Sequence, residues 1–277
     1  MVLYAIDNFL AGTDVAVISS SEDTLYVLEN LWNRRPSKPF RFTGHGSVGN
    51  PEWVCAEFDA PKNVTIAALF NHNLTALTGG NDALVLKACD DPCAVSGGCD
   101  WATPDYSHSL QDRLIDHWND LYHVIDETRL SYRLEVIDES NPVEVELGEF
   151  FLGELTELDS ARLSPGRVES PTLYRFLNVT PYGQHWAESL SNSVSLSLTV
   201  TNLNDPAQVD AVRVMIEAVH ANGGRFVIVP NDAFPFVYYV FLENDGGFMR
   251  QIFRGSDCEL LEWTFELRTL TKGISLL

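Results

Sequence analysis

The side chains best suited to ligand contact form a basic, aromatic segment near the start of the chain. Trp32, Arg34 and Arg35 open this segment, which continues to Phe42. An indole ring can stack on a sugar, and guanidinium groups donate to carboxylates or hydroxyl groups. These residue types predict a contact patch for a sugar or for an acidic neighbouring subunit. The alternative is a loop entering a strand, with the arginine stems packed over core aromatics.

A second polar cluster, Asn71-His72-Asn73, directly follows the apolar run 64–70. Residues that bind ligands are often carried on loops, which a rigid scaffold of strands holds in place. We therefore expect Asn71, His72 and Asn73 to contribute to the same kind of ligand or partner contact.

Cysteine spacing raises the question of a metal. Cys89, Cys93 and Cys99 lie close together but lack the paired CxxC spacing of a zinc site, and the histidines of the segment 108–123 could complete a ligand set. The alternative is a Gly-rich surface loop with free thiols or one local disulfide. The five cysteines of the chain cannot all pair, and the sequence predicts a reducing compartment.

Motifs of catalysis and of cofactor binding are absent from the sequence, which has no GxSxG, GxxxxGK, HExxH or GxGxxG after a strand. Adjacent carboxylates such as Asp90-Asp91 are expected by chance among 39 Asp and Glu residues. We therefore predict a protein without enzymatic activity or cofactor. A glycan-active enzyme would require two carboxylates facing each other in a cleft.

The charge balance restricts the partners. The chain carries 18 Lys and Arg residues against 39 Asp and Glu residues, for a formal charge of −21. Nucleic acid and anionic membranes bind clustered cations, so neither is an expected partner. The first residues lack a basic leader and an apolar core, and no apolar stretch reaches the roughly 18 residues that span a bilayer. We expect neither secretion nor membrane insertion.

Strand patterns dominate the chain. Segments 130–136, 143–147, 194–200 and 261–267 alternate apolar and polar side chains, the period of a half-buried strand. Apolar runs at 64–70, 83–88, 226–229 and 237–242 predict buried central strands. The sequence therefore predicts a mainly β protein with antiparallel sheets.

One main helix is predicted at about 206–222. Asp205 can cap it, Pro206 suits its first position, Gln208 completes a pair resembling a capping box, and Gly223-Gly224 ends it. An apolar stripe at helical spacing predicts a core-facing side, formed by Val209, Val212, Ile216 and Val219.

A domain boundary is predicted at about residue 158, where the strand rhythm breaks before Pro165-Gly166. The predicted domains are residues 1–158 and 159–277.

The first domain resembles a discoidin, or galactose-binding-like, jelly roll. The resemblance rests on an early loop at 33–36, strands at 53–58 and 64–73 joined by an Asp59-Ala60-Pro61 turn, and closing strands at 132–137 and 145–153. It implies a β-sandwich that presents ligands on loops at one end. Sugar-contacting residues vary in that family, so no residue is carried over from it.

The second domain resembles the distal tail or baseplate proteins of long-tailed bacteriophages, through its Ser/Thr-rich strand, its capped helix and its final strand 261–268. That resemblance implies a structural subunit of the virion, made in the bacterial cytoplasm, that forms a ring with copies of itself and contacts other tail proteins. The jelly roll would then hold fibres or touch host surface carbohydrate. A stand-alone carbohydrate-binding module is the alternative function, and a glycan-active enzyme is the third.

Overall fold

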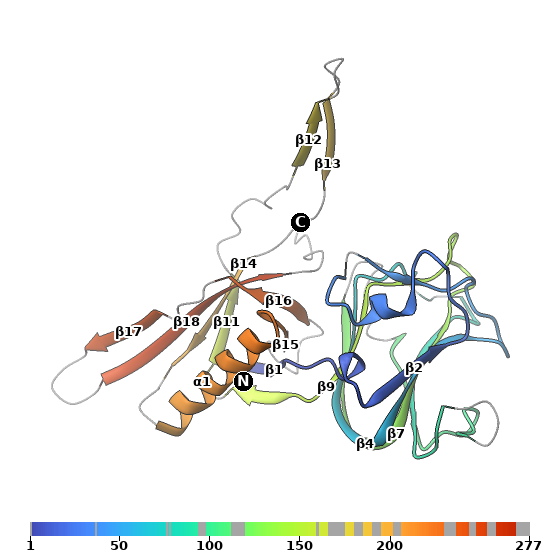
Figure 1. Cartoon of the computed structure of the whole chain (residues 1–277), viewed down its shortest axis with the longest axis horizontal. Coiled ribbons are helices and arrows are strands. Elements are labelled where there is room, and N and C mark those ends of the chain that lie inside the picture. The colour runs from blue at the N-terminus through green and yellow to red at the C-terminus, as the bar shows by residue number, and fades with distance from the viewer. Residues whose placement is uncertain are drawn as a thin grey trace. The chain divides into compact units, whose positions relative to one another are not determined.

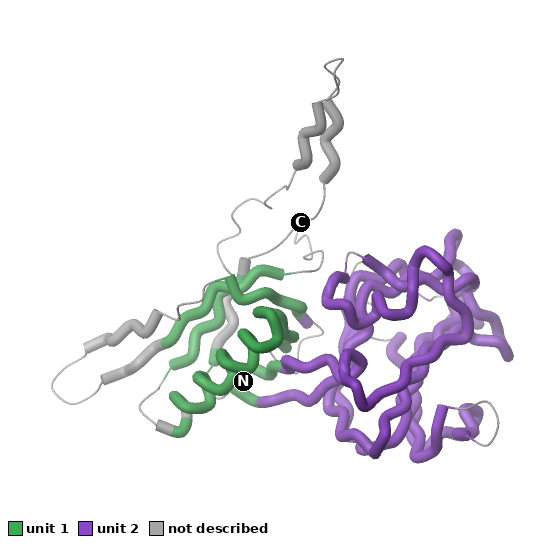
Figure 2. Tube along the Cα trace, in the orientation of Figure 1, with its two compact units in different colours: residues 1–4, 157–231, 238–277 green, residues 5–156, 232–237 purple. Residues whose placement is uncertain are grey.

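The computed structural model divides the chain into two compact units (Figure 2). Unit 1 comprises residues 1–4, 157–231 and 238–277, and unit 2 comprises residues 5–156 and 232–237. The residues that the structure describes are 2–36, 38–75, 77, 79–93, 98–111, 120–158, 161–165, 175–179, 185–189, 195–201, 206–229, 237–243, 248–253 and 259–269.

Unit 2 is built on antiparallel β-strands, as the sequence predicts. Its main sheet has the order β2-β4-β7-β5-β6, and β9 pairs with β4. A two-stranded sheet joins β3 to β8. The bounds are β2 Val15–Ser19, β3 Phe40–Arg41, β4 Glu52–Phe70, β5 Ala83–Cys89, β6 Tyr106–Ser109, β7 Leu121–Ile137, β8 Glu146–Leu147 and β9 Glu149–Gly153, with short 3-10 helices at Phe9–Ala11 and Leu28–Leu31.

The two long strands β4 and β7 curve together (Figure 1), and the pairing between them is irregular in the middle. Their pairing shifts register between Glu57 and Lys62, so the predicted turn at Asp59-Ala60-Pro61 is wrong: these residues remain within β4. The extra residues form a bulge, which lets a strand bend while it stays paired. The buried hydroxyl group of Tyr132 lies 2.8 Å from the carbonyl oxygen of Lys62 and 2.6 Å from that of Glu127, and so joins the two irregular segments.

The core of unit 2 follows from strand alternation. Val54, Ala56 and Phe58 on β4 are buried, as are Tyr132 and Leu134 on β7. Side chains two residues apart share a face of a sheet, so these residues form one apolar layer. Beyond the bulge, Val64, Ala67 and Leu69 join the same core.

The segment predicted as a strand at 143–147 is strand only at Glu146–Leu147. Val145 and Leu147 are buried, but Val143 is 53% exposed. The segment 143–145 is part of the loop between β7 and β8, so its alternation does not extend into a sheet.

Unit 1 contains an eight-stranded sheet of order β10-β1-β15-β16-β18-β14-β11, with β17 paired to β18. Strands β10 and β11 are the first and last strands in this order. Only residues 159–160 separate them in the chain, so the sheet must curve to bring these two strands near each other. The bounds are β1 Val2–Ala5, β10 Thr156–Leu158, β11 Ala161–Pro165, β14 Ser195–Val200, β15 Arg225–Val229, β16 Tyr238–Leu242, β17 Phe248–Phe253 and β18 Glu259–Thr269; β12 Arg175–Val179 and β13 His185–Ser189 pair separately.

Helix α1 spans Pro206–Ala221, close to the predicted 206–222. Val212 and Val219 are buried, as predicted, and Met215 is the third fully buried side chain of that face. Gly223 and Gly224 have φ values of +70° and +79°, the left-handed conformation that ends many helices. Asp205, the predicted cap, lies outside the described residues. No helix among the described residues has the length and apolar character required to cross a bilayer.

The division between the units follows residue 156, near the predicted boundary at 158. One difference matters: strand β1 at the start of the chain lies in the sheet of unit 1, between β10 and β15. Residues 5–156 of unit 2 are therefore inserted between two parts of unit 1, so a single boundary does not separate the two units.

Candidate functional site

The two polar clusters singled out in the sequence meet at one end of unit 2. The side-chain amide of Asn71 donates to the carbonyl oxygen of Pro36, 2.5 Å away, which joins the loop after β4 to the basic segment. The backbone N–H of Asn71 donates to the Asp120 carboxylate. Gly148 lies against both loops, because a side chain there would collide with the carbonyl oxygens of Pro36 and Asn71.

Trp32, Arg34 and Arg35 contribute to this end in different ways. Trp32 is partly buried and packs against the hydrophobic core, which is the packing that the alternative interpretation of the segment describes. Arg35 is exposed, as is Lys38 beyond it. Arg34 is partly exposed and adopts a φ of +62° at the turn. Arg35 and Lys38 therefore face solvent, whereas the indole ring packs against the core.

Asn73 holds β8 in place. Its amide nitrogen donates to the Glu144 carbonyl oxygen at 2.8 Å, and its amide oxygen accepts from the Glu146 backbone N–H at 2.7 Å. The Asn141 side chain donates to the carbonyl oxygen of Asn73. His72 is partly buried between Asn71 and Asn73. Asn73 therefore holds the backbone from which the Glu146 side chain extends.

Arg41 lies at the centre of the next contacts. The pairing of β3 with β8 sets Arg41 opposite Glu146, and Arg41 Nε donates to Glu146 Oε1 at 2.8 Å. Asp23 lies 4.0 Å from the guanidinium group, whose Cζ is 3.8 Å from the centroid of the Tyr26 ring. The hydrogen bond that Arg41 donates to the Glu146 carboxylate raises the pKa of Arg41 above its ordinary value.

We name Asp23, Tyr26, Arg41, Asn73 and Glu146 the Arg41 cluster. The side chains of Arg41 and Glu146 are held by each other yet remain 25% and 26% exposed. The cluster therefore offers charged hydrogen-bonding groups of fixed orientation beside an aromatic ring. Polar groups of fixed orientation next to an apolar surface are what recognition of a small polar ligand requires.

Sequence reasoning placed Asn73 and the basic segment near a ligand but did not identify Asp23, Tyr26 or Glu146. Arg41 and Glu146 are 105 residues apart, and their strands are two residues long, too short to give an alternating pattern. A cue was present in the sequence: Arg41 lies between Phe40 and Phe42, which are both buried, so its own side chain points the opposite way.

The metal hypothesis for the cysteines is replaced by disulfides. Cys89 pairs with Cys99, and Cys93 pairs with Cys55 on β4. A sulfur atom in a disulfide is not the thiolate that binds zinc. One of these bonds is the local disulfide considered as an alternative. The described residues contain no group of three His, Cys, Asp or Glu side chains able to hold a metal ion.

Disulfides persist under oxidising conditions, whereas the sequence favours a reducing compartment, which stays a prediction. Cys258, the fifth cysteine, lies outside the described residues.

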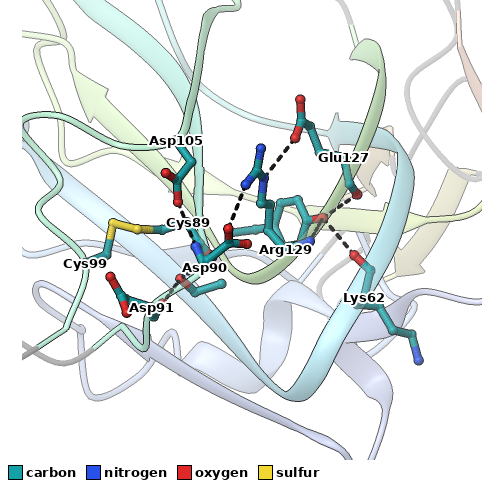
Figure 3. Close-up of polar contacts among 10 residues, drawn as sticks. Lys62, Cys89, Asp90, Asp91, Cys99, Asp105, Glu127 and Arg129 are labelled. Atoms are coloured by element: carbon teal, nitrogen blue, oxygen red, sulfur yellow. Dashed lines mark hydrogen bonds and ion pairs between the residues drawn. A yellow bond between two sulfur atoms is a disulfide. The ribbon is translucent and has the colours of Figure 1, made fainter.

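Around the Cys89–Cys99 disulfide, charged residues pair with one another (Figure 3). Arg129 contacts Asp90 and Glu127, each at 2.9 Å, and the carboxylate of Asp105 accepts from the Asp90 backbone N–H. These contacts connect the β5–β6 loop to β7. The guanidinium group of Arg129 is thus paired with two carboxylates, and these contacts stabilise the loop.

His108 and His123 stack with ring centroids 3.7 Å apart, and the hydroxyl group of Tyr106 lies 2.8 Å from His123 Nε2. His117, the third histidine considered as a metal ligand, lies outside the described residues. The pair therefore contributes a ring contact between β6 and β7.

No family model and no curated protein matches the chain. Among solved structures, CpGH89CBM32-6 from Clostridium perfringens is 10% identical, covers 53% of this chain and 99% of its own length, and has a TM-score of 0.37. Chitosan-binding module 1 of a Paenibacillus sp. IK-5 chitosanase/glucanase is 12% identical, with 53% and 99% coverage and a TM-score of 0.37. The CBM32 of AlyQ, in complex with 4,5-unsaturated mannuronic acid, is 14% identical, with 53% and 96% coverage and a TM-score of 0.35.

Proposed function

We propose that unit 2 is a carbohydrate-binding module whose saccharide site is the Arg41 cluster. The observation that supports this proposal is the arrangement of Arg41, which is paired with Glu146, stacked on Tyr26 and still a quarter exposed. A saccharide presents hydroxyl groups around an apolar ring face. Charged hydrogen-bonding groups held beside an aromatic side chain match both features.

The charge of the cluster favours a particular class of saccharide. Two carboxylates, Asp23 and Glu146, flank a single guanidinium group. Exposed Glu144 and Glu22 add further negative charge nearby. A uronic acid would bring a carboxylate into this surface, whereas an amino sugar would bring a cation. We therefore propose neutral or amino sugars as ligands.

The proposed role is binding without cleavage. A glycosidase uses two carboxyl groups on either side of the scissile bond, one of which must donate a proton to the leaving group. In the Arg41 cluster both Asp23 and Glu146 lie against the same guanidinium group. That arrangement suits recognition of hydroxyl groups more than proton transfer.

Calorimetric titration of the full chain with neutral, amino and uronic oligosaccharides tests the proposal. Replacing Arg41 by Gln removes the cation and should weaken binding roughly tenfold or more, since hydrogen bonds to charged groups contribute about 1.5–3 kcal/mol. Arg129→Gln is a matched control, because Arg129 is also 25% exposed and ion-paired with two carboxylates. Binding of no saccharide, or equal losses in the two variants, would contradict the proposal.

A second candidate concerns unit 1: a ring-forming structural subunit of a bacteriophage tail. The supporting observation is that, among the described strands, β17 pairs only with β18, and β12 and β13 pair only with each other. Strand edges without partners suit pairing with a neighbouring subunit. Electron microscopy of the purified chain tests this role. A closed ring supports it, and particles that never exceed one or two copies contradict it.

A further inference from the structure

Exposed aliphatic side chains gather at one end of unit 2. Seven large hydrophobic side chains are exposed among the described residues, and four of them lie at this end: Ile18, Leu25, Val48 and Val143. Leu25 is 79% exposed, Val48 65% and Val143 53%. Single exposed hydrophobic residues are ordinary, but three on neighbouring loop tips mark a contact surface.

The loops that carry these tips are bonded side by side. The Asp23 N–H donates to the carbonyl oxygen of Arg41, which connects the loop of Leu25 to β3. The Asp138 N–H donates to the carbonyl oxygen of His45, which connects the loop of Val143 to the loop of Val48. These hydrogen bonds join the backbones of the three loops, and we name Leu25, Val48 and Val143, one exposed on each loop, the loop-tip face.

The charge of the loop-tip face is negative. Glu22 on the loop of Leu25 and Glu139 and Glu144 on the loop of Val143 are exposed. The one guanidinium group beside them, that of Arg41, is already paired with Glu146 and lies near Asp23. A surface that docks here should therefore carry cations around an apolar contact.

Such cations occur at the same end of unit 2. Arg35 and Lys38 are exposed on the segment 33–39, which we name the basic loop. This loop leads directly into β3, and its Pro36 is bonded to Asn71. The basic loop thus precedes β3 and the loop of Val48 follows it, so that a basic patch and an acidic patch adjoin the same short strand.

We propose that this end of unit 2 docks on the same end of a second copy of the chain through an isologous two-fold contact. In such a contact each surface patch meets the other patch of its partner. The acidic loop-tip face of one copy would meet the basic loop of the other, and this pairing would occur twice. The aliphatic tips would supply the apolar centre that charge pairs at the rim do not.

The proposal differs from saccharide binding, although its contact lies next to the Arg41 cluster, and it differs from ring formation, because it predicts a dimer built by unit 2. It can be tested by sedimentation velocity on the full chain over a series of concentrations. We expect a monomer–dimer equilibrium. Leu25→Glu combined with Val48→Glu should weaken dimerisation at least roughly tenfold, because charges would enter the apolar contact. Val214→Glu is the control, since Val214 is 62% exposed on helix α1 of unit 1.

A charge-exchange experiment examines the two-fold arrangement itself. One variant carries Arg35→Glu and Lys38→Glu, and the other carries Glu139→Lys and Glu144→Lys. Each variant alone should dimerise less than the wild type, because like charges would meet in both contacts. An equimolar mixture should form heterodimers, because both contacts between the two variants are complementary. Circular dichroism checks that both variants are folded.

Other occupants of the loop-tip face predict different results. A chain that is monomeric into the millimolar range overturns the proposal, as does an assembly that survives the Leu25→Glu, Val48→Glu change. A mixture of the charge variants that forms no heterodimer also overturns it. Flotation of the chain with vesicles of phosphatidylserine and phosphatidylcholine, abolished by the same change, would assign the face to a membrane instead. Loss of saccharide binding in Arg41→Gln with an unchanged dimer would support both proposals, because the two contacts would then depend on different side chains.

Discussion

The hydroxyl group of Tyr132 lies 2.8 Å from the carbonyl oxygen of Lys62, although 70 residues separate the two in the chain. The contact joins β7 to β4 where the pairing of both strands loses its regular register. A second contact, to the carbonyl oxygen of Glu127, and a hydrogen bond accepted from the Arg129 N–H complete the environment of this hydroxyl group. One buried hydroxyl group therefore contacts backbone groups of both strands beside the irregular pairing.

Tyr132→Phe should lower the free energy of unfolding by about 1–3 kcal/mol, since the backbone groups at the bulge would lose their partner in a buried environment. Urea denaturation followed by tryptophan fluorescence measures the change. Tyr106→Phe is the control: its hydroxyl group has one hydrogen-bond contact, with His123, and Tyr106 is only partly buried, so its loss should be smaller. An equal loss in the two variants would argue against a special role for the bulge.

The stability of the protein should fall in strongly alkaline solution. Burial raises the pKa of Tyr132 from 10.0 to about 12. The unfolded chain therefore ionises this phenol first, so the stabilising contribution is complete below pH 10 and is lost as the pH rises towards about 12. Urea denaturation between neutral pH and about pH 11.5 measures the slope, which should be shallower in Tyr132→Phe. Identical slopes would show that Tyr132 titrates normally.

The two disulfides should differ in their contribution to stability. Cys55–Cys93 closes a sequence separation of 38 residues and Cys89–Cys99 one of 10, and chain entropy predicts about 4 and about 3 kcal/mol respectively. We therefore expect Cys55→Ala, Cys93→Ala to unfold at lower urea than Cys89→Ala, Cys99→Ala. The reverse order would contradict the entropic argument. Thiol titration of the denatured, non-reduced chain should give one free thiol, since four of five cysteines are paired.

The glycine pair after helix α1 allows a comparison within two adjacent residues. Both have positive φ values, but a side chain at Gly224 would lie 2.8 Å from the Phe241 ring, whereas one at Gly223 would meet nothing within 4 Å. Gly223→Ala should cost about 1 kcal/mol for its backbone alone, and Gly224→Ala should cost more, because the Phe241 ring must also shift. Thermal unfolding measures both. Equal losses would mean that Phe241 moves freely.

The elements that sequence reasoning predicted well are those with long, regular patterns. Strands β14 and β18 alternate cleanly over their length, and helix α1 has both an apolar stripe and a glycine stop. The pattern fails where a strand bends: residues 59–61 contain a turn-forming sequence and have no partner on β7, yet they stay within β4 between two paired segments. Local propensity is weaker than pairing along a whole strand.

The candidate site was only partly predictable, because it depends on contacts between distant parts of the chain. Asn71 and Asn73 follow a recognisable apolar run, so their position at a strand end could be inferred. The ion pair of Arg41 with Glu146 depends on pairing between strands of two residues each. Side chains in the β5–β6 loop were misread for a related reason: Cys93 bonds to Cys55 across 38 residues, which spacing within the loop cannot reveal.

Strand β1 lies in the sheet of unit 1, so residues 5–156 of unit 2 form an insertion between two strands of that sheet. The segment 5–156 of unit 2 begins and ends at adjacent points, because a side chain at Gly153 would lie 2.9 Å from the carbonyl oxygen of Asp7. Replacing the intervening residues by a short linker should leave the order of unit 1 strands intact. Truncation from the start of the chain, in contrast, would take β1 out of that sheet along with unit 2.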